Sequence, residues 1–184
     1  MRRRTLPVIA MLLAAASVGR SRDLPEAPEG FHWEQATGIK AALLAPDGWF
    51  FREEAKPTVI AYVISREDSK AAGKFETGFT LNVNRVSRGD SVEWAKKVVA
   101  EFSKAKKNKL LKSWDVNRPV LTGAGCDVEI GEGRDGIKME LVALGNPRTN
   151  AVYLMTFEAP LARWDEAWKL GREMMSHVSL SDEF

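Results

Sequence analysis

Residues 150–180, NAVYLMTFEAPLARWDEAWKLGREMMSHVSL, decide the fold that the sequence predicts. Their first part predicts a β-strand, because two sets of residues alternate along it, as the two faces of a strand require: Val152, Leu154 and Thr156 against Tyr153, Met155 and Phe157. Pro160 suits the first turn of a following helix, where a missing N–H costs nothing. One face of that helix carries Trp164, Trp168, Gly171 and Met175, at spacings of four, three and four. We therefore expect a strand and then a helix that packs on a sheet, with both tryptophans in the core rather than in a cofactor site.

The length and composition predict one globular domain. The chain has 184 residues, of which 45% are hydrophobic and 28% are charged, an ordinary balance for a globular protein. That length fills one core well and is too short for two comfortable ones. We assign residues 31–184 to this domain and residues 17–30, with Pro25 and Pro28 among charges, to a flexible leader.

The N-terminus has the pattern of a secretory signal peptide. Arg2, Arg3 and Arg4 precede an almost uncharged apolar run, residues 5–18, which contains the A-x-A sequence of residues 14–16. The run is too short to span a bilayer comfortably, so residues 1–16 are expected to be cleaved, after export by the general or the twin-arginine route. No cysteine follows the run directly, which predicts a periplasmic or extracellular protein that is not a lipoprotein.

Cleavage would also change the net charge. Of the 27 Lys and Arg residues three would be lost, which leaves 24 against 25 Asp and Glu residues. A nearly neutral protein has no general attraction for phosphate backbones, so we expect no nucleic-acid partner.

Several further stretches predict strands joined mostly by hairpins: residues 31–36, 39–45, 58–65, 79–86, 113–120, 122–131 and 137–144. Residues 58–65 are apolar on both faces, which predicts a central strand. The aromatic residues Trp49, Phe50 and Phe51 are expected to pack over one end of the sheet, with a sugar- or partner-binding patch as the alternative. The fold class is therefore α+β, an α/β/α sandwich with a central, largely antiparallel sheet flanked by helices.

A second helix is predicted from about Asp90, which forms a capping-box pattern with Glu93. Its apolar stripe is expected to contain Trp94, Ala95, Val98, Val99 and Phe102. Its far end is the most basic part of the domain: Lys104, Lys106, Lys107, Lys109 and Lys112. Cations favour the C-terminus of a helix, so a solvated helix end is the simplest interpretation. The alternative is a docking patch for anionic lipid or an acidic partner.

No catalytic, cofactor-binding or metal-binding residues are assigned. The two histidines, His32 and His177, have no nucleophile motif to serve, and His and Cys are too few for a zinc site. Cys126 alternates with Val128 and Ile130, which predicts a buried, unreactive thiol. One acidic cluster leaves a weak calcium site open as an alternative to local neutralisation: Asp127, Glu129, Glu132 and Asp135.

Several core and turn segments together resemble the PsbP-like superfamily, which includes PsbP, Ran-binding Mog-type proteins and bacterial DcrB-type exported proteins. The segments are Pro46-Asp47-Gly48-Trp49, residues 79–86, Val152-Tyr153-Leu154, Thr156, Ala159-Pro160 and Trp164. The resemblance implies an α/β/α sandwich and a non-catalytic domain that docks on protein partners. It carries over no catalytic residue, since its motifs are structural. This chain departs from the lipoprotein relatives by lacking their lipid-bearing cysteine, and nothing in it resembles a photosystem-docking arm.

The resulting functional hypothesis is an exported, non-catalytic interaction or assembly module of the cell envelope, whose partner is another envelope protein. The loop of residues 66–78 and the hairpin tip of residues 131–136 are the candidate docking segments, because both are charged and contain glycine. The alternative is a small-ligand or envelope-lipid binding protein, with a cleft beside residues 49–51 or with the basic patch of residues 104–112.

Overall fold

The computed structural model describes residues 24–180, apart from 56–58, 69, 71–74 and 132. The predicted signal peptide lies outside this range, as do residues 17–23, the first half of the predicted leader. Seven strands form one sheet in which every neighbouring pair is antiparallel. In spatial order they are β3 (Phe50–Ala55), β4 (Val59–Ser65), β5 (Gly78–Arg85), β9 (Ala151–Pro160), β8 (Ile137–Asn146), β7 (Thr122–Ile130) and β6 (Asn108–Asn117). The predicted antiparallel sheet is confirmed.

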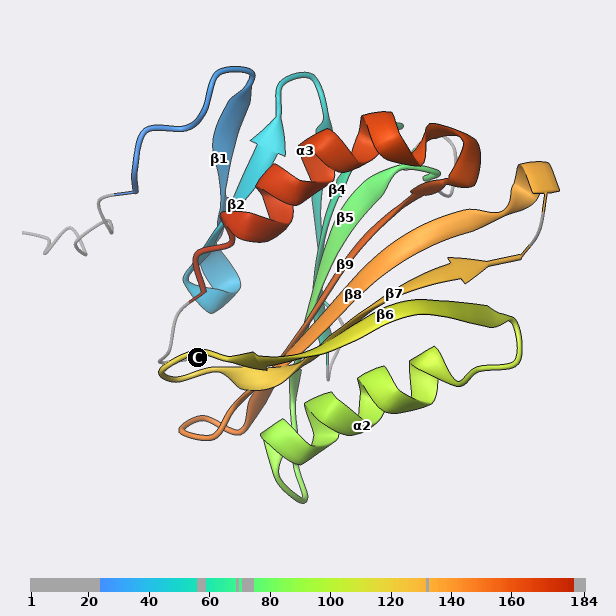
Figure 1. Ribbon diagram of the computed structural model, residues 1–184. Helices are drawn as coiled ribbons and strands as arrows, with labels where there is room; N and C mark the ends of the chain where they lie inside the picture. Colours follow the sequence, from blue (N-terminus) through green and yellow to red (C-terminus); the bar gives the residue numbers. More distant parts are fainter. Residues whose placement is uncertain (1–23, 56–58, 69, 71–74, 132, 181–184) are drawn as a thin grey trace, which may run out of the picture.

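Helices cover the two faces of this sheet. Helix α2 (Ser91–Ser103) packs on β7, β8 and β9, and α3 (Trp164–Ser176) packs on β9, β5 and β2. Figure 1 shows the two helices on opposite sides of the strands. Each helix has its own hydrophobic cluster, the larger one under α3. The chain is therefore an α/β/α sandwich of the α+β class, as predicted.

A two-stranded hairpin flanks α3. It consists of β1 (Phe31–Ala36) and β2 (Ala41–Pro46), joined by the 3₁₀ turn η1 (Thr37–Ile39). The prediction that the second strand begins at residue 39 was wrong, because Ile39 ends the turn and Lys40 has a left-handed φ of 51°. Strand β2 is buried along its whole length, and its residue Ala42 also bridges to Ser179 beyond α3.

Strand β9 and helix α3 form the centre of the core. Tyr153, Met155 and Phe157 are buried on the α3 side, while Val152 joins the α2 cluster, which confirms the predicted alternation. Gly171 lies directly over Phe157, since a Cβ at Gly171 would come within 2.5 Å of that ring. The strand and helix connection differs from prediction. Pro160 ends β9 with an extended ψ of 138°, the 3₁₀ turn η3 (Leu161–Arg163) follows, and α3 starts only at Trp164.

The edges of the sheet differ most from the sequence prediction. Strand β3 was not predicted, because its segment FFREEA is mostly polar, as suits an edge strand with one wet face. Strand β4 is second from the edge and not central. Trp49 and Phe51 pack against the α3-side core as expected, but Phe50 is 45% exposed and belongs to no aromatic cluster over the sheet.

Helix α2 begins as predicted. The Asp90 carboxylate accepts hydrogen bonds from the backbone N–H groups of Val92 and Glu93, at 2.8 and 2.9 Å. Ala95 and Val99 are buried, and Phe102 packs beside them. The placement of Trp94 on the buried stripe was wrong, because this side chain is 37% exposed.

The basic segment is not a helix end as a whole. Helix α2 ends at Ser103, so only Lys104, Lys106 and Lys107 follow it directly. Lys109 and Lys112 lie on β6, which starts earlier than predicted. Among the described residues, no helix combines the length and the apolar character needed to cross a membrane.

Candidate functional site

Helix α3 leaves part of its sheet face uncovered. It packs on β9, β5 and β2, whereas β8, β7 and β6 curve away from it (Figure 1). Directly opposite residues of neighbouring strands share a face of the sheet. Val142 of β8 belongs to the α3-side core, so its strand neighbours Glu140 and Lys138, at alternate positions, face the same side. We call the α3 side of β6, β7 and β8 the open face.

Two rows of charged residues cross the open face. One row joins Lys112, Asp127 and Glu140. The other row joins Lys109, Glu129 and Lys138, and within it Lys109 Nζ lies 2.8 Å from Glu129 Oε2. The exposed pair contributes little stability by itself. The rows show that the open face carries ordered charges of both signs beside the apolar core.

A groove of about 460 Å³ lies between α3 and β6 on this face. The α3 wall contains Trp168, Arg172, Met175 and Ser176, the β6 wall contains residues 114–118, and the floor contains Glu140, Val142 and Met155. Trp114 lies flat on Gly125, where any Cβ would collide with the indole. Lys112 Nζ is 5.1 Å from the Trp114 ring centre, within cation–π range.

The groove continues an aromatic stack in the core. The rings of Trp164 and Trp168 are stacked with centres 5.1 Å apart, and both contact Phe157, at 5.9 and 5.7 Å. Lys138 Nζ lies 4.8 Å from the Trp164 ring centre. Trp164 is only 6% exposed, whereas Trp168 is half-buried and lines the groove. Trp164 therefore serves the core, and Trp168 serves both the core and the groove.

The carboxyl group of Glu140, on the groove floor, interacts with that of its strand neighbour Asp127. The pKa of Glu140 is raised to about 7, mainly by burial and also by the negative charge of the neighbouring Asp127. Burial also raises the pKa of Asp127, against the lowering effects of Lys138, a hydrogen bond from Glu140 and Lys112. Since its pKa is about 7, Glu140 is partly protonated near neutral pH. The groove floor can therefore change charge in the physiological range.

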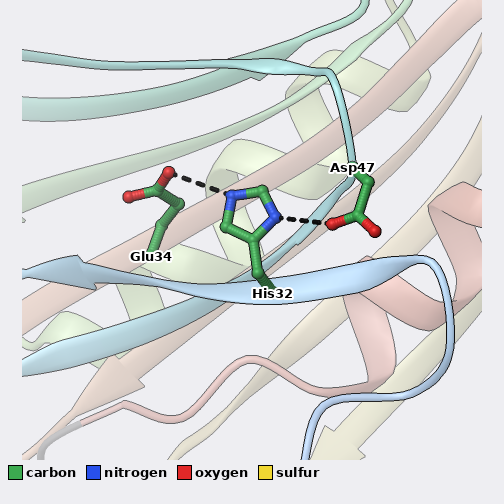
Figure 2. A network of polar contacts seen from close by, with 3 residues as sticks. All are labelled: His32, Glu34 and Asp47. Carbon is green, nitrogen blue, oxygen red and sulfur yellow. Dashed lines mark hydrogen bonds and ion pairs between the residues drawn. The ribbon is translucent and has the colours of Figure 1, made fainter.

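The predicted reactive residues lie elsewhere. His32 of β1 is held between two carboxylates, with Nδ1 3.1 Å from Asp47 Oδ1 and Nε2 3.2 Å from Glu34 Oε1 (Figure 2). The Asp47 hydrogen bond, opposed by burial and supported by Glu34, raises the pKa of His32. His177 follows α3, and its ring contacts the Glu173 carbonyl at 3.0 Å. Neither imidazole lines the groove.

Cys126 is fully buried in the α2-side core, as predicted. Burial, with smaller effects from Asp127 and Glu140, raises the pKa of its thiol to about 11. The thiol is therefore protonated at neutral pH and sheltered from reagents.

The three described members of the acidic cluster, Asp127, Glu129 and Asp135, do not form one site. Asp127 faces Glu140, Glu129 pairs with Lys109, and Asp135 lies in the turn η2 (Gly133–Asp135). Glu132 lies outside the described residues. Within the described part of the chain, no group of three or more His, Cys, Asp or Glu side chains is arranged to hold a metal ion.

A second hollow, of about 600 Å³, borders the open face at the hairpin tip. It brings the basic segment and the predicted docking tip together, with Lys106, Lys107 and Lys109 opposite Gly131, Gly133 and Leu161. Of the other predicted docking segment, residues 66–78, only residues 69 and 71–74 lie outside the described residues. Its end was wrongly assigned to an exposed loop, because Thr77 and Gly78 are buried and Gly78 begins β5.

The sequence prediction missed the groove residues Trp114, Arg118, Glu140 and Arg172. A signal for one wall was present, because Lys112, Trp114 and Val116 alternate along one strand face. The opposite wall and the floor come from α3 and β8, and only the strand register brings them together.

Comparison with known proteins identifies the fold. No protein-family profile matches the chain. The solution structure of cyanobacterial PsbP (CyanoP) from Synechocystis sp. PCC 6803 superimposes with a TM-score of 0.54, covering 90% of this chain and 100% of CyanoP at 12% identity. The chain has the PsbP-like fold. An identity this low shows a shared fold and leaves the function open.

Two other likenesses are weaker. The Saccharomyces cerevisiae Ran-binding protein Mog1p matches 82% of this chain and 95% of its own at 15% identity, with a TM-score of 0.48, too low to support a conclusion by itself. In sequence, 113 residues are 31% identical to the DNA-directed RNA polymerase subunit β′ of Clavibacter michiganensis subsp. michiganensis. That match covers 60% of this chain but spans only 8% of the polymerase subunit.

Proposed function

We propose that this PsbP-like chain is an exported, non-catalytic domain of the cell envelope that binds a segment of a partner protein in the groove between α3 and β6. The observation that carries the proposal is the groove itself. It combines two indole rings, Trp114 and Trp168, with the guanidinium groups of Arg118 and Arg172. Neither arginine forms an ion pair with any residue that the structure describes. Tryptophan and arginine are the residues most enriched at the energetic centres of protein interfaces.

The placement of the reactive side chains supports binding rather than catalysis. The Cys126 thiol is buried and has a pKa of about 11. The ring nitrogens of His32 are both engaged by carboxylates, so neither is free to act as a base. Glu140 is the groove residue with a pKa near neutrality, and its position suits recognition of a donor group on a ligand.

The chemistry of the N-terminus supports export. Residues 1–16 have the charge and hydropathy pattern of a signal peptide, with residues 17–30 as the leader and residues 31–184 as the folded domain. N-terminal sequencing of the protein recovered from cells should begin near Ser17. A mature chain that keeps Arg2, Arg3 and Arg4 would contradict export by cleavage.

The binding proposal is tested with a groove variant and a matched control. The groove variant Trp114→Ala removes the indole from the β6 wall. The control variant Trp94→Ala removes a 37% exposed indole from α2, the helix that covers the other face of the sheet. The mature chain should capture one partner from an envelope extract, and the purified partner should bind Trp94→Ala as it binds the original chain. Trp114→Ala should lower that affinity at least about tenfold, as the loss of an interface centre does. Equal binding by both variants would place the interface elsewhere.

A small-ligand binding protein is the second candidate. The groove volume of about 460 Å³ lies within the usual size range of small-molecule sites. Native mass spectrometry of gently purified protein distinguishes the two candidates. A bound small molecule that is lost in Trp114→Ala would favour the ligand, whereas unliganded protein that captures a partner would favour the protein interface.

A further inference from the structure

We infer that the partner segment is acidic and extended, and that it lies along the open face between the basic hollow at Lys106 and the groove at Arg118. This inference rests on the proposed function and adds the chemistry of the partner. The observation behind it is the distribution of charge along the border of the open face.

Cations border the open face on both sides. On the β6 side they are Lys106, Lys107, Lys109, Lys112 and Arg118, and on the α3 side they are Lys138 and Arg172. The carboxylates of the same face are Asp127, Glu129 and Glu140. Asp115 also borders the groove, but its carboxylate lies on the opposite face of the sheet, 3.9 Å from Lys96 of α2. The open face therefore has an excess of positive charge although the domain as a whole is nearly neutral.

The carboxylates of the open face cancel only part of this excess. Glu129 is paired with Lys109 at 2.8 Å, so this pair leaves the other six cations unneutralised by Glu129. Glu140 has a pKa of about 7 and is only partly ionised at neutral pH. Lys106, Lys107, Arg118 and Arg172 are exposed, and none of them has an ion pair with another described residue. Carboxylates of a partner that lies along this border could therefore form ion pairs with these cations.

The dimensions fit an extended polypeptide. Strand β6 has 10 residues, which corresponds to about 33 Å of extended chain. An extended segment presents alternate side chains to opposite sides, so acidic residues can reach the bordering cations while intervening apolar residues enter the groove at Trp114 and Trp168.

The shape argues against the two other anionic partners. A bilayer surface is broad and cannot enter a groove between a helix and a strand. A nucleic acid brings a phosphate at every nucleotide, and Asp127 and Glu129 on the open face would repel those phosphates. A polypeptide can place its carboxylates only where cations lie.

The test uses random ten-residue peptides displayed on phage and the full mature chain as bait. One variant removes three open-face cations: Lys107→Gln, Lys112→Gln and Arg172→Gln. The matched control removes the same charges from the α2 side: Arg88→Gln, Lys96→Gln and Lys97→Gln. All these side chains are exposed, and a melting curve of each variant checks that it is folded.

Selected peptides should be rich in Asp and Glu, with at least one aromatic or aliphatic residue between them. Their affinity should fall about tenfold in the open-face variant, from three lost surface ion pairs, and less than about twofold in the control. Their binding should weaken as salt rises from 0.05 to about 0.5 M. Selected peptides without acidic enrichment, or an equal loss in both variants, would overturn the inference.

Competing probes separate the other partner classes and the parent proposal. Phosphatidylglycerol vesicles and a twelve-nucleotide single-stranded DNA should not displace the selected peptide at 0.15 M salt, because a bilayer cannot enter the groove and Asp127 and Glu129 repel the phosphates of DNA. Displacement by either probe would overturn the acidic-peptide assignment. If the peptides fail these tests but Trp114→Ala still abolishes partner capture, only the partner chemistry is wrong. If Trp114→Ala leaves partner capture unchanged, the proposed groove function itself is wrong.

Discussion

Replacement of Trp164 by Ala should strongly destabilise the domain. The side chain is 6% exposed and fits between the Phe157 ring, the Trp168 ring and Lys138. Its loss removes buried indole surface and opens a cavity between α3 and β9 that the two remaining rings cannot close. We expect a loss of about 4 kcal/mol in the free energy of unfolding, the middle of the range for buried aromatic residues.

Trp94 provides the control on the other helix. It is 37% exposed on α2, so Trp94→Ala removes less buried surface than Trp164→Ala and gains some helix propensity. We expect a change below about 1 kcal/mol. With a urea dependence of about 2 kcal/mol per molar, Trp164→Ala should lower the unfolding midpoint by about 2 M and Trp94→Ala by less than about 0.5 M.

Equilibrium unfolding in urea, followed by far-ultraviolet circular dichroism, measures both midpoints. An unchanged midpoint for Trp164→Ala would show that the α3 stripe does not hold the helix on the sheet. Equal shifts for the two tryptophans would show that burial does not separate their roles.

Three further predictions concern the core and the two titrating sites. Gly171→Ala should cost about 1–2 kcal/mol, because the new Cβ would lie within 2.5 Å of Phe157 and overpacking outweighs the gain in helix propensity; an unchanged melting temperature would contradict this. The pKa of Glu140, which faces Asp127, Lys112 and Lys138, is raised from 4.5 to about 7, so the folded state binds the proton more tightly than the unfolded state. Its ionisation should therefore lower the free energy of unfolding as the pH rises from about 4.5 to 7. Glu140→Gln should be about 1–2 kcal/mol more stable than the original chain at pH 8 but not at pH 4.5. An equal gain in stability at both pH values would contradict the assignment. The pKa of His32 should exceed 6.5 in an NMR titration and fall in Asp47→Asn, because the Asp47 hydrogen bond is the largest cause of the shift.

The parts of the fold with strong periodicity were predictable from the sequence. In residues 150–180 the period changes from two to about 3.6 within a few residues, which fixes a strand and a helix that must share one core. The alternation of Phe79, Leu81 and Val83 likewise gave β5, and the side chain of Asp90 marked the start of α2. These features depend on neighbours in the chain and therefore appear in the sequence.

The wrong predictions have a common physical cause, since each depended on what another segment covers. Trp94 lies on a helix and is apolar, but α2 is rotated so that Ala95 and Val99 face the sheet. Residues 58–65 are apolar enough for a central strand, yet the strand order places β4 next to the edge. Polar edge strands such as β3 give almost no periodic signal.

The candidate site was less predictable than the fold. Its walls come from residues near 114 and near 172, and its floor from Glu140, so the groove exists only after the strands adopt their register. The basic segment was visible in the sequence, but its assignment to a helix end hid the fact that Lys109 and Lys112 border an open sheet face. The sequence showed the charge, and only the structure shows what it surrounds.

Site-specific photo-crosslinking in the native cell tests the central claim most directly. The photoreactive residue p-benzoylphenylalanine is placed at Asn117, an exposed residue of the groove, and for comparison at Lys97, an exposed residue of α2 on the other face of the sheet. If the groove binds a partner segment, illumination should give one discrete crosslinked protein from position 117 and none from position 97. The absence of a crosslink at 117, or the same product from both positions, would contradict the assignment of the groove as the binding site.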